Sequence, residues 1–308
     1  MKIIVTGGAG FIGSNLVDSL VEKDFDVIVI DNQSADCHDQ FYHNNGASYY
    51  KCDINDYDLI ERLFIDADYV FHLAAEARIQ PTIENPRLAV QTNVLGTCNI
   101  LEASRKHNVK RVIYSSTSSA YGLKNDPPLV ETMDRDCLNP YSVSKCAGED
   151  LCKMYHSLYG LETVIFRYFN VYGERQPTKG QYAPVIGIFQ RQYANGEPMT
   201  VVGDGLQTRD YVHVSDVVEA NILMALHEDK SCLGEIFNVG TGHNYSVLDI
   251  VFMIGSKDAD YIHIQNRLGE ARNTLADNKK LKSFGWTPKV NLKEHLVKRI
   301  IDRTKENV

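Results

Sequence analysis

Residues 2–13 read KIIVTGGAGFIG. The first five form an apolar run of strand length, and a glycine-rich turn follows at once. Apolar residues then recur at three- and four-residue steps from Ile12, which predicts a helix. Strand, glycine turn and helix in this order are typical of a turn that binds a dinucleotide. Gly7 permits the tight turn, Gly10 lets the backbone approach a pyrophosphate, and Gly13 lets the helix pack closely on the strand.

The next apolar run, at residues 26–30, predicts a second strand that ends at Asp31. A carboxylate at this place accepts hydrogen bonds from both ribose hydroxyls of an adenosine and repels a 2′-phosphate. The free N–H groups at the start of the first helix favour the pyrophosphate. The sequence therefore predicts NAD as the cofactor. A purely structural glycine turn without a cofactor is the alternative.

Length and composition narrow the possible classes of protein. A chain of 308 residues can hold a core domain and a smaller lobe. No apolar run reaches the length of a membrane span, and the N-terminus reads as a core strand and not as a signal peptide. The net charge of −8 gives no support to nucleic-acid binding. The seven cysteines form no Cys-x-x-Cys pair, so we expect free thiols in a cytoplasmic protein and no metal site.

Apolar strands alternate with helical patterns along the first two thirds of the chain, which predicts an α/β fold with a Rossmann-type, doubly wound parallel sheet. Further strands are expected at 48–52, 68–75, 110–116, 163–170 and 235–240. Helices are expected at 57–64, 86–107, 141–159, 184–194 and 292–304, and the segment 32–47 is expected to be a loop with a short helix. We assign residues 1–172 to an NAD-binding domain, with returning segments near 211–241, and 173–308 mainly to a smaller C-terminal α/β substrate lobe.

Ligands of such sheets bind at the carboxyl ends of the strands, where further cofactor-binding candidates lie. Asp53 is expected to accept from the adenine amino group, to cap the helix at 57–64, or to do both. Ala74 and Ala75 leave room for a ribose against the backbone. Asn93, a polar residue in an apolar helix, is expected either to hydrogen-bond to the next strand or to lie on a solvated face. The full set of candidates is Gly7, Gly10, Phe11, Ile12, Gly13, Asp31, Asn32, Asp53, Ile54, Leu73, Ala74, Ala75, Asn93, Ser115, Tyr141, Lys145 and Tyr168.

Tyr141 and Lys145 are four residues apart, so both side chains lie on one face of their helix. A tyrosine pKa of about 10 is too high for a base at neutral pH, but a nearby ammonium and the positive nicotinamide ring both lower it. A phenolate can take a proton from a sugar hydroxyl while hydride leaves the same carbon. Thr117, at the end of a hydroxyl-rich strand, can hold that oxygen, and Lys145 can also bind the nicotinamide ribose. These residues indicate reversible alcohol–ketone oxidation; a surface Tyr/Lys pair is the alternative.

Five motifs carry a resemblance that runs essentially from end to end of the chain. They are TGGAGFIG at 6–13, Tyr141-x-x-x-Lys145, RYFNVYG at 167–173, GDGLQTRDYV at 203–212 and RLGE at 267–270. Together they resemble the extended short-chain dehydrogenase/reductase family, and within it the NAD-dependent nucleotide-sugar epimerases and dehydratases.

The resemblance implies a role for each matching residue. Tyr141 is implied as the base, Lys145 as its partner and Thr117 as the assisting hydroxyl. The substrate-binding residues that it implies, together with two pocket candidates, are Thr117, Asn170, Val185, Arg209, Arg267, Thr274 and Arg78. Among these, Asn170 and the arginines at 209 and 267 are implied to bind the pyrophosphate of a UDP-sugar, since guanidinium groups suit phosphate. A surface ion pair is the alternative for each arginine.

Departures from related enzymes favour one branch. Family dehydratases carry Asp-Glu after the catalytic threonine, where this chain has Ser118-Ser119. Related decarboxylases have Glu at the position of Ser119, and uronate 4-epimerases usually have Thr at the position of Asn170. The resemblance therefore implies a UDP-hexose 4-epimerase. After Ala75 many relatives have a small residue and Ser near the sugar, where this chain has the run EARIQ at 76–80. Arg78 in this run is expected to contact the substrate or a helix dipole, and it leaves the exact sugar open.

Thr274 stands seven residues after Arg267, at a position that lines the sugar pocket in the resembling enzymes. A small residue there implies room for N-acetylated sugars; packing between strands is the alternative.

The family also pairs two helices from each subunit, here 86–107 and 141–159, into a four-helix bundle, which implies a homodimer. Two readings stay open: another nucleotide-sugar modifier, such as a dehydratase, a reductase, or an epimerase of uronates or GDP-sugars, and a cofactor-sensing regulator without catalysis, although such regulators usually lack the Tyr/Lys pair.

Overall fold

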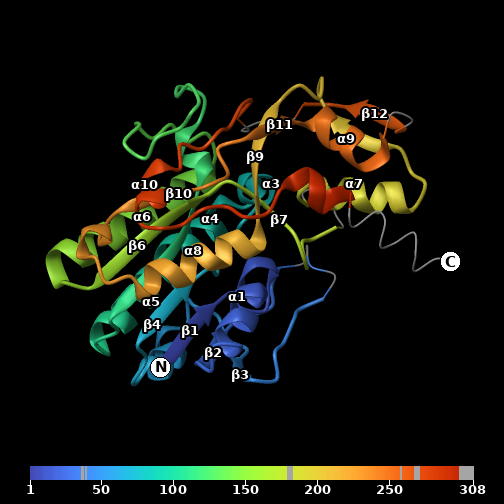
Figure 1. Ribbon diagram of the computed structural model, residues 1–308. Helices are drawn as coiled ribbons and strands as arrows, with labels where there is room; N and C mark the ends of the chain where they lie inside the picture. The colour runs from blue at the N-terminus through green and yellow to red at the C-terminus, as the bar shows by residue number, and fades with distance from the viewer. Residues whose placement is uncertain (36–37, 39, 179–182, 257–258, 267–270, 298–308) are drawn as a thin grey trace.

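A computed structural model describes residues 1–308 except 36–37, 39, 179–182, 257–258, 267–270 and 298–308. The described residues form a seven-stranded parallel sheet, flanked by helices, and a smaller lobe at the carboxyl ends of its strands (Figure 1). The order in the main sheet is β10-β6-β5-β4-β1-β2-β3. Its strands are β1 (Lys2–Thr6), β2 (Asp26–Ile30), β3 (Ala47–Tyr50), β4 (Tyr69–His72), β5 (Arg111–Thr117), β6 (Glu162–Tyr168) and β10 (Ile236–Val239). This order confirms the predicted doubly wound fold.

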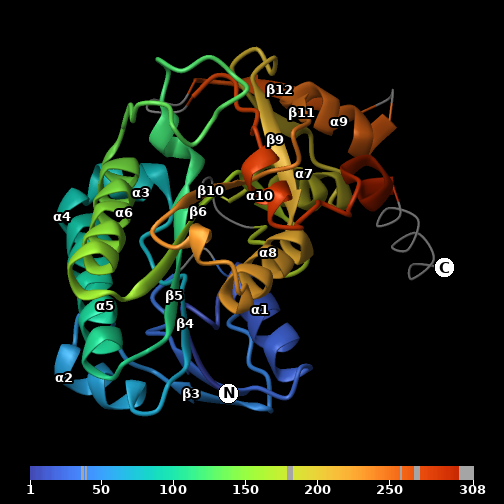
Figure 2. The same ribbon diagram turned by 60° about the vertical axis from the view of Figure 1, so that its left-hand side comes forward.

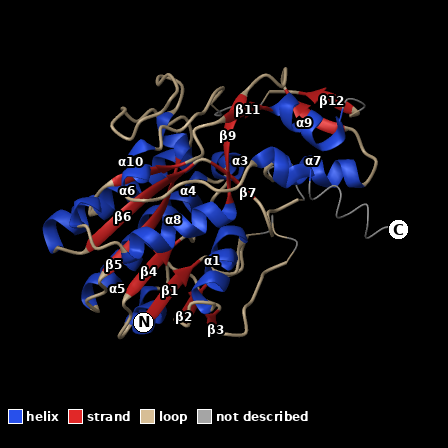
Figure 3. Ribbon diagram, in the orientation of Figure 1, coloured by secondary structure: helices blue, strands red, loops and turns tan. Residues whose placement is uncertain are grey.

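Helices cover both faces of the sheet, which is why its strands read as nearly continuous apolar runs (Figure 3). The helices on one face are α1 (Phe11–Val21), α8 (Val214–Leu226) and α10 (Lys279–Ser283). Those on the other are α2 (Tyr57–Ile60), η1 (Glu61–Phe64), α5 (Thr97–Lys106) and α6 (Pro140–Tyr159). Neighbouring residues of β1 divide between the faces: Ile3 and Val5 join the first core, and Ile4 joins the second.

The helix expected at 86–107 is divided by a π-helical segment that the sequence did not predict. It consists of α4 (Pro86–Val90), the π segment η2 (Gln91–Gly96) and α5. The Thr97 hydroxyl donates to the Asn93 carbonyl over 2.7 Å, within this distorted part. These segments lie beside α6 on one side of the molecule (Figure 2), with the short α3 (Ile79–Glu84) next to them.

The lobe is built around its own apolar core. One of its sheets has the order β11-β9-β7 and the other pairs β12 with β8. Its elements are β7 (Asn170–Tyr172), α7 (Val185–Ala194), β8 (Met199–Val202), β9 (Thr208–His213), β11 (Asn244–Ser246), α9 (Val247–Gly255) and β12 (Tyr261–Ile264), with η3 (Ser118–Tyr121) and η4 (Lys230–Cys232) elsewhere in the chain. The chain crosses between main sheet and lobe repeatedly, because β10 and α10 both return to the sheet. The proposed boundary at residue 172 stays a prediction.

The remaining differences from the sequence expectations are local. The strands expected at 48–52 and 68–75 end earlier, at Tyr50 and His72. The described residues of the segment 32–46 contain no helix. Residues 292–297 are helical as expected, and the rest of that predicted helix lies outside the described residues. Within the described ranges, no helix is both long and apolar enough to cross a membrane.

Candidate functional site

A cavity of about 530 Å³ opens at the carboxyl ends of β1 and β4, where the strand order reverses, and extends to the lobe. It brings together most of the predicted site residues. Those that line it are Gly7, Gly10, Phe11, Ile12, Gly13, Asp31, Asn32, Asp53, Ile54, Leu73, Ala74, Ala75, Arg78, Ser115, Thr117, Tyr141, Lys145, Tyr168, Asn170, Arg209 and Thr274. Asn93 and Val185 do not line it. Arg267 lies outside the described residues.

The glycine turn has the close approaches that its spacing predicts. Gly7 has φ +70°, and a Cβ there would lie 2.8 Å from the Ala74 nitrogen. A Cβ on Gly13 would lie 2.2 Å from the Gly7 carbonyl oxygen. Gly10 is the N-cap residue of α1 and provides no side-chain cap, so the first helical turn presents backbone to the cavity. This cradle fits a dinucleotide pyrophosphate.

The Asp31 carboxylate is fixed by two backbone donors. Its Oδ2 accepts from the Ala9 N–H over 2.9 Å, and its Oδ1 accepts from the Gln33 N–H over 2.8 Å. Each carboxylate oxygen has a further lone pair for a ribose hydroxyl. The carboxylate predicted to bind the adenosine ribose is thus held in part by the glycine turn itself.

Asp53 lines the cavity but does not cap a helix. The Asn32 amide donates to its Oδ2 over 2.9 Å, and the Asn55 N–H donates to its Oδ1 over 2.8 Å. The N-cap position of α2 belongs to Asp56. The capping alternative for Asp53 is therefore wrong. Its carboxylate accepts from the N–H of Asn55 in a tight turn, and Asp53 lies three residues before the N-cap of α2.

Asn93 joins two elements that neither reading of the sequence proposed. It is fully buried, its Oδ1 accepts from the Glu76 N–H over 2.8 Å, and its amide donates to the Glu76 carbonyl and to Ser144 Oγ. It therefore connects the loop after β4 to α6, and both the strand contact and the solvated face are wrong. Asn93 reaches the cavity only through Glu76, which lines it.

The start of α6 is fixed by local sequence. Asn139 is the N-cap, its side chain and that of Ser142 form a capping box, and Pro140 occupies the first turn. Tyr141 and Lys145 therefore enter the cavity from a rigid helix end, opposite Thr117 at the end of β5. The predicted pair and the hydroxyl thus meet in one place.

The electrostatics of Tyr141 differ from the expectation. Burial raises the pKa of its phenol above the usual value, while a hydrogen bond with Thr117 and the charge of Arg78 oppose that shift. Lys145 Nζ instead lies 4.3 Å from the centroid of the Tyr114 ring, and burial lowers the pKa of Lys145 to about 8. The expected lowering of the pKa of Tyr141 by Lys145 is not found in this arrangement, because the ammonium is held over another ring.

A buried ion pair behind the cavity holds α6 against the sheet, and sequence reasoning missed it. Both oxygens of Glu149 accept from the Arg167 guanidinium, over 2.9 and 2.8 Å. Ser116, on β5, donates to the same carboxylate over 2.6 Å. Only the fold brings these three residues together, although Arg167 belongs to a quoted motif.

The substrate side of the cavity is anchored on β9. Arg209 Nη1 donates to the carbonyls of Thr208 and Arg272, over 3.0 and 2.8 Å. The Asn170 amide donates to the Asp210 carbonyl over 3.1 Å. Val185 begins α7 and packs against the core of the lobe, while its neighbours Ala183 and Pro184 line the cavity.

Thr274 meets both sequence interpretations at once. It lines the cavity and is 6% exposed. Its Oγ accepts from the Asp210 N–H over 3.4 Å, and its own N–H donates to the Thr208 carbonyl over 3.0 Å. Asp210 in turn is buried and accepts from backbone N–H groups of Thr241, Gly242 and Ala276, so one carboxylate fixes the pocket wall.

Comparisons with known proteins agree with this geometry. The sequence profile of the NAD dependent epimerase/dehydratase family matches residues 3–240. A Methanocaldococcus jannaschii protein with a provisional UDP-glucose 4-epimerase name is 42% identical over 310 residues, which cover 99% of each chain.

Two solved structures are similar over nearly the whole chain. The Thermotoga maritima UDP-glucose 4-epimerase, solved with UDP-glucose, is 38% identical with a TM-score of 0.89 and 96% of each chain covered. The UDP-N-acetylglucosamine 4-epimerase of Methanobrevibacter ruminantium M1, solved with UDP-N-acetylmuramic acid, is 34% identical with a TM-score of 0.89 and 98% of each chain covered. The chain belongs to the NAD-dependent epimerase/dehydratase family, in the branch of the short-chain dehydrogenase/reductase enzymes that use NAD to isomerise their substrates.

Proposed function

We propose that this enzyme interconverts UDP-hexoses at carbon 4 and also accepts UDP-N-acetylglucosamine and UDP-N-acetylgalactosamine. One observation supports the reaction most directly. Tyr141, Lys145 and Thr117 line the same cavity as the glycine turn and Asp31. A dehydratase or a reductase is less well supported, because Ser118 and Ser119 follow Thr117 where a dehydratase has acidic residues.

The residues present fit NAD at one end of the cavity. The turn at Gly7–Gly13 would hold the pyrophosphate, Asp31 the adenosine ribose, and Lys145 the ribose of the nicotinamide. Bound there, NAD would supply the acceptor for hydride from carbon 4 of the sugar and the donor for its return to the opposite face, so the cycle would have no net redox change.

Tyr141 is assigned the proton transfer. Its phenolate takes the proton of the C4 hydroxyl, while the Thr117 hydroxyl, which shares a hydrogen bond with Tyr141, holds the same oxygen. The guanidinium of Arg78 stabilises the negative phenolate. Tyr141 returns the proton to the C4 oxygen after the 4-keto sugar has rotated in the site.

Rotation of the sugar requires that its phosphates stay fixed. We assign this task to Asn170, Arg209 and Arg267, with Val185 as a further contact at the start of α7. The anchoring of Arg209 on two backbone carbonyls supports the role, because a preoriented guanidinium loses little freedom on binding phosphate.

The size of the sugar pocket supports the N-acetylated substrates. Thr274 lines the cavity with a short side chain, which takes less of the pocket than an aromatic ring would and so favours an acetamido group there. A packed aromatic ring at this place would exclude that group, and steric exclusion outweighs the loss of one contact.

A second candidate substrate is a UDP-sugar with a carboxylate, such as a UDP-uronate. Arg78 lines the cavity close enough to Tyr141 to affect its pKa, and a guanidinium there can pair with an anionic group on the sugar. Asn170 speaks against this candidate, since uronate 4-epimerases usually have threonine at its position.

A homodimer through a four-helix bundle is also proposed. Apolar side chains are exposed on α4, η2 and α6, which lie side by side (Figure 2). They are Leu88, Val90, Leu95, Val143, Met154, Leu158 and Tyr159. A second copy of the same face would cover them.

Proton NMR of purified enzyme with a panel of UDP-sugars, without added NAD, tests the proposal. We expect interconversion of UDP-glucose with UDP-galactose and of the two N-acetylated sugars. Turnover of UDP-glucuronate alone would establish the second candidate. Conversion of the UDP-sugar to a stable keto product with loss of water would instead identify a dehydratase.

A further inference from the structure

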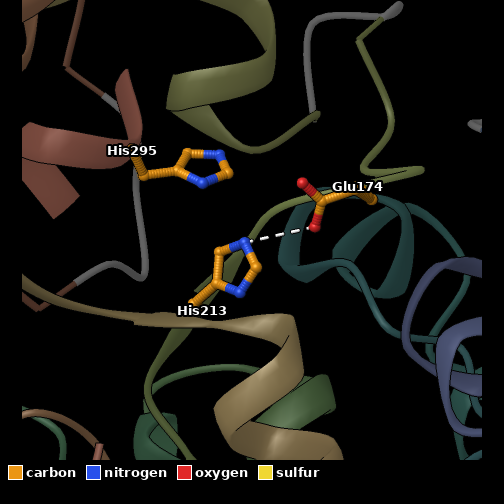
Figure 4. A group of neighbouring side chains, drawn as sticks. All are labelled: Glu174, His213 and His295. Atoms are coloured by element: carbon orange, nitrogen blue, oxygen red, sulfur yellow. Dashed lines mark ion pairs between the residues drawn. The ribbon is translucent and has the colours of Figure 1, made fainter. Parts of the chain in front are cut away.

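Three side chains outside the cavity converge on one point (Figure 4). Glu174 follows β7, His213 is the last residue of β9, and His295 lies in the helical segment 292–297. One ring nitrogen of each histidine and one carboxylate oxygen all lie within 4.8 Å of one another. His213 Nε2 is 3.2 Å from Glu174 Oε2. We propose that this cluster is a binding site for a divalent transition-metal ion, with zinc as the best fit.

The donor set and its spacing suit zinc. Two imidazoles and one carboxylate, with a fourth position for water, form a common zinc ligand set, whereas magnesium and calcium prefer oxygen donors. Tetrahedral bonds of about 2.0–2.1 Å place the donor atoms roughly 3.4 Å apart. Glu174 and His213 already have that spacing. The His295 ring nitrogen lies within 4.8 Å of the other two ligand atoms, so a movement of its ring towards them would complete the site.

His213 has a polar partner at its second ring nitrogen, Nδ1. Its Nδ1 lies 2.7 Å from Ser215 Oγ and accepts from the Ser215 N–H over 3.2 Å. While Nδ1 accepts that bond, the ring proton is at Nε2 and points to Glu174. A metal ion at Nε2 moves the proton to Nδ1, where Ser215 Oγ accepts it, so the ring stays neutral.

A glycine keeps the donor nitrogen accessible. Gly173 has φ +138°, and a Cβ there would lie 2.9 Å from His213 Nε2 and 2.7 Å from a methyl group of Val214. Any side chain at this position would therefore crowd the place of the ion. This observation is independent of the spacing of the three ligands.

The site would fasten the C-terminal segment to the junction of β9 and α8. Leu292 and Leu296 already pack in the core of the lobe, and Asp216 accepts from the N–H groups of Lys289 and Val290. His295 continues this attachment towards Glu174. Metal binding to the folded state alone raises thermal stability, so the proposed role is structural.

The ligands are 39 and 82 residues apart along the chain, as their numbers 174, 213 and 295 give. No short metal-binding spacing could have revealed them. The spacing of the cysteines predicts no metal site, but that prediction does not extend to these two histidines and the glutamate.

Zinc titration of chelator-treated enzyme, in competition with a chromophoric chelator, tests the proposal. The ligand variants are Glu174→Gln, His295→Gln and His213→Asn, the last chosen because asparagine can still cap α8. His243→Gln, outside the cluster, is the matched control. We expect wild type and control to bind one equivalent of zinc tightly. Each ligand variant should bind zinc about 100-fold or more weakly, a larger effect than the loss of a group that only hydrogen-bonds to a ligand.

Two further readouts decide the matter. Cobalt(II) in place of zinc should give visible absorption of a tetrahedral site in wild type and lose it in Glu174→Gln. Zinc should raise the melting temperature of wild type and leave that of Glu174→Gln unchanged. Equal zinc affinity in wild type and ligand variants, or no tight binding by wild type, overturns the proposal. If His213→Asn fails to fold, Glu174→Gln and His295→Gln decide, since neither side chain belongs to the buried core.

Discussion

The Thr117 hydroxyl acts on the Tyr141 phenol by opposing the rise in its pKa that burial causes, although Thr117 ends a strand and Tyr141 begins a helix. Both elements are held by the buried Glu149–Arg167 pair, to which Ser116 donates. The position of Tyr141 relative to Thr117 is thus set by the packing of α6 on β5. The proposed proton transfer, which occurs twice in each cycle, requires such a fixed pair.

Tyr141→Phe should keep the fold and lower turnover by at least about 100-fold, the usual scale of acid–base catalysis. The phenyl ring fills the same space but cannot exchange a proton. Turnover measured by NMR, with circular dichroism as the control for folding, checks this. Near-normal turnover would disprove the role of Tyr141.

Arg78→Met should raise the pKa of Tyr141 further, because the guanidinium opposes the effect of burial. A base acts in its deprotonated form, so the rising limb of the profile of kcat against pH should move to higher pH. Arg78→Lys keeps a positive charge and should leave the limb near its wild-type position. Identical profiles for all three proteins would show that Arg78 has no influence on the base.

NAD should co-purify with the enzyme, because the proposed cycle regenerates it and turnover does not require its dissociation. Absorbance of the supernatant after denaturation measures this.

Asp31→Asn keeps an acceptor for the Ala9 N–H but removes the negative charge, so NADP should bind better relative to NAD than in wild type. Unchanged discrimination would place the selection elsewhere.

Leu158→Glu should convert a dimer to a monomer. This side chain is 65% exposed on α6, and burial of a charge inside the four-helix bundle between the two subunits is unfavourable. Leu123→Glu is the matched control, because Leu123 is 60% exposed and lies outside those helices. Light scattering at micromolar concentration gives the mass; a monomeric wild type refutes the bundle.

Thr274→Tyr should lose turnover of the N-acetylated sugars selectively and keep that of UDP-galactose. The ring would project into the proposed sugar pocket, because Thr274 lines the cavity. Thr274→Ser is the control and should keep both activities. Loss of both pairs in the tyrosine variant, or rejection of the N-acetylated pair by wild type, would defeat the argument for this residue but not the epimerase assignment.

The sequence was sufficient for the sheet and for the residues at its strand ends. Glycine spacing, apolar runs and the Tyr141/Lys145 interval are local patterns, and parallel strands bring their carboxyl ends together whatever the details of packing. Partners across the fold were not predictable in this way. Asn93 holds Glu76 and Ser144, and Arg78 affects Tyr141, because distant turns meet in space.

The return of the chain to the main sheet has a consequence for synthesis. Trp286 is completely buried in the core beside α8, and its indole N–H donates to the Asp216 carbonyl over 2.9 Å. Leu281 of α10 joins the same core. The core on this face of the main sheet therefore lacks part of its interior until Trp286 has emerged from the ribosome. A polypeptide released early, at the end of β10, would expose that unfinished interior and become a target for chaperones and proteases.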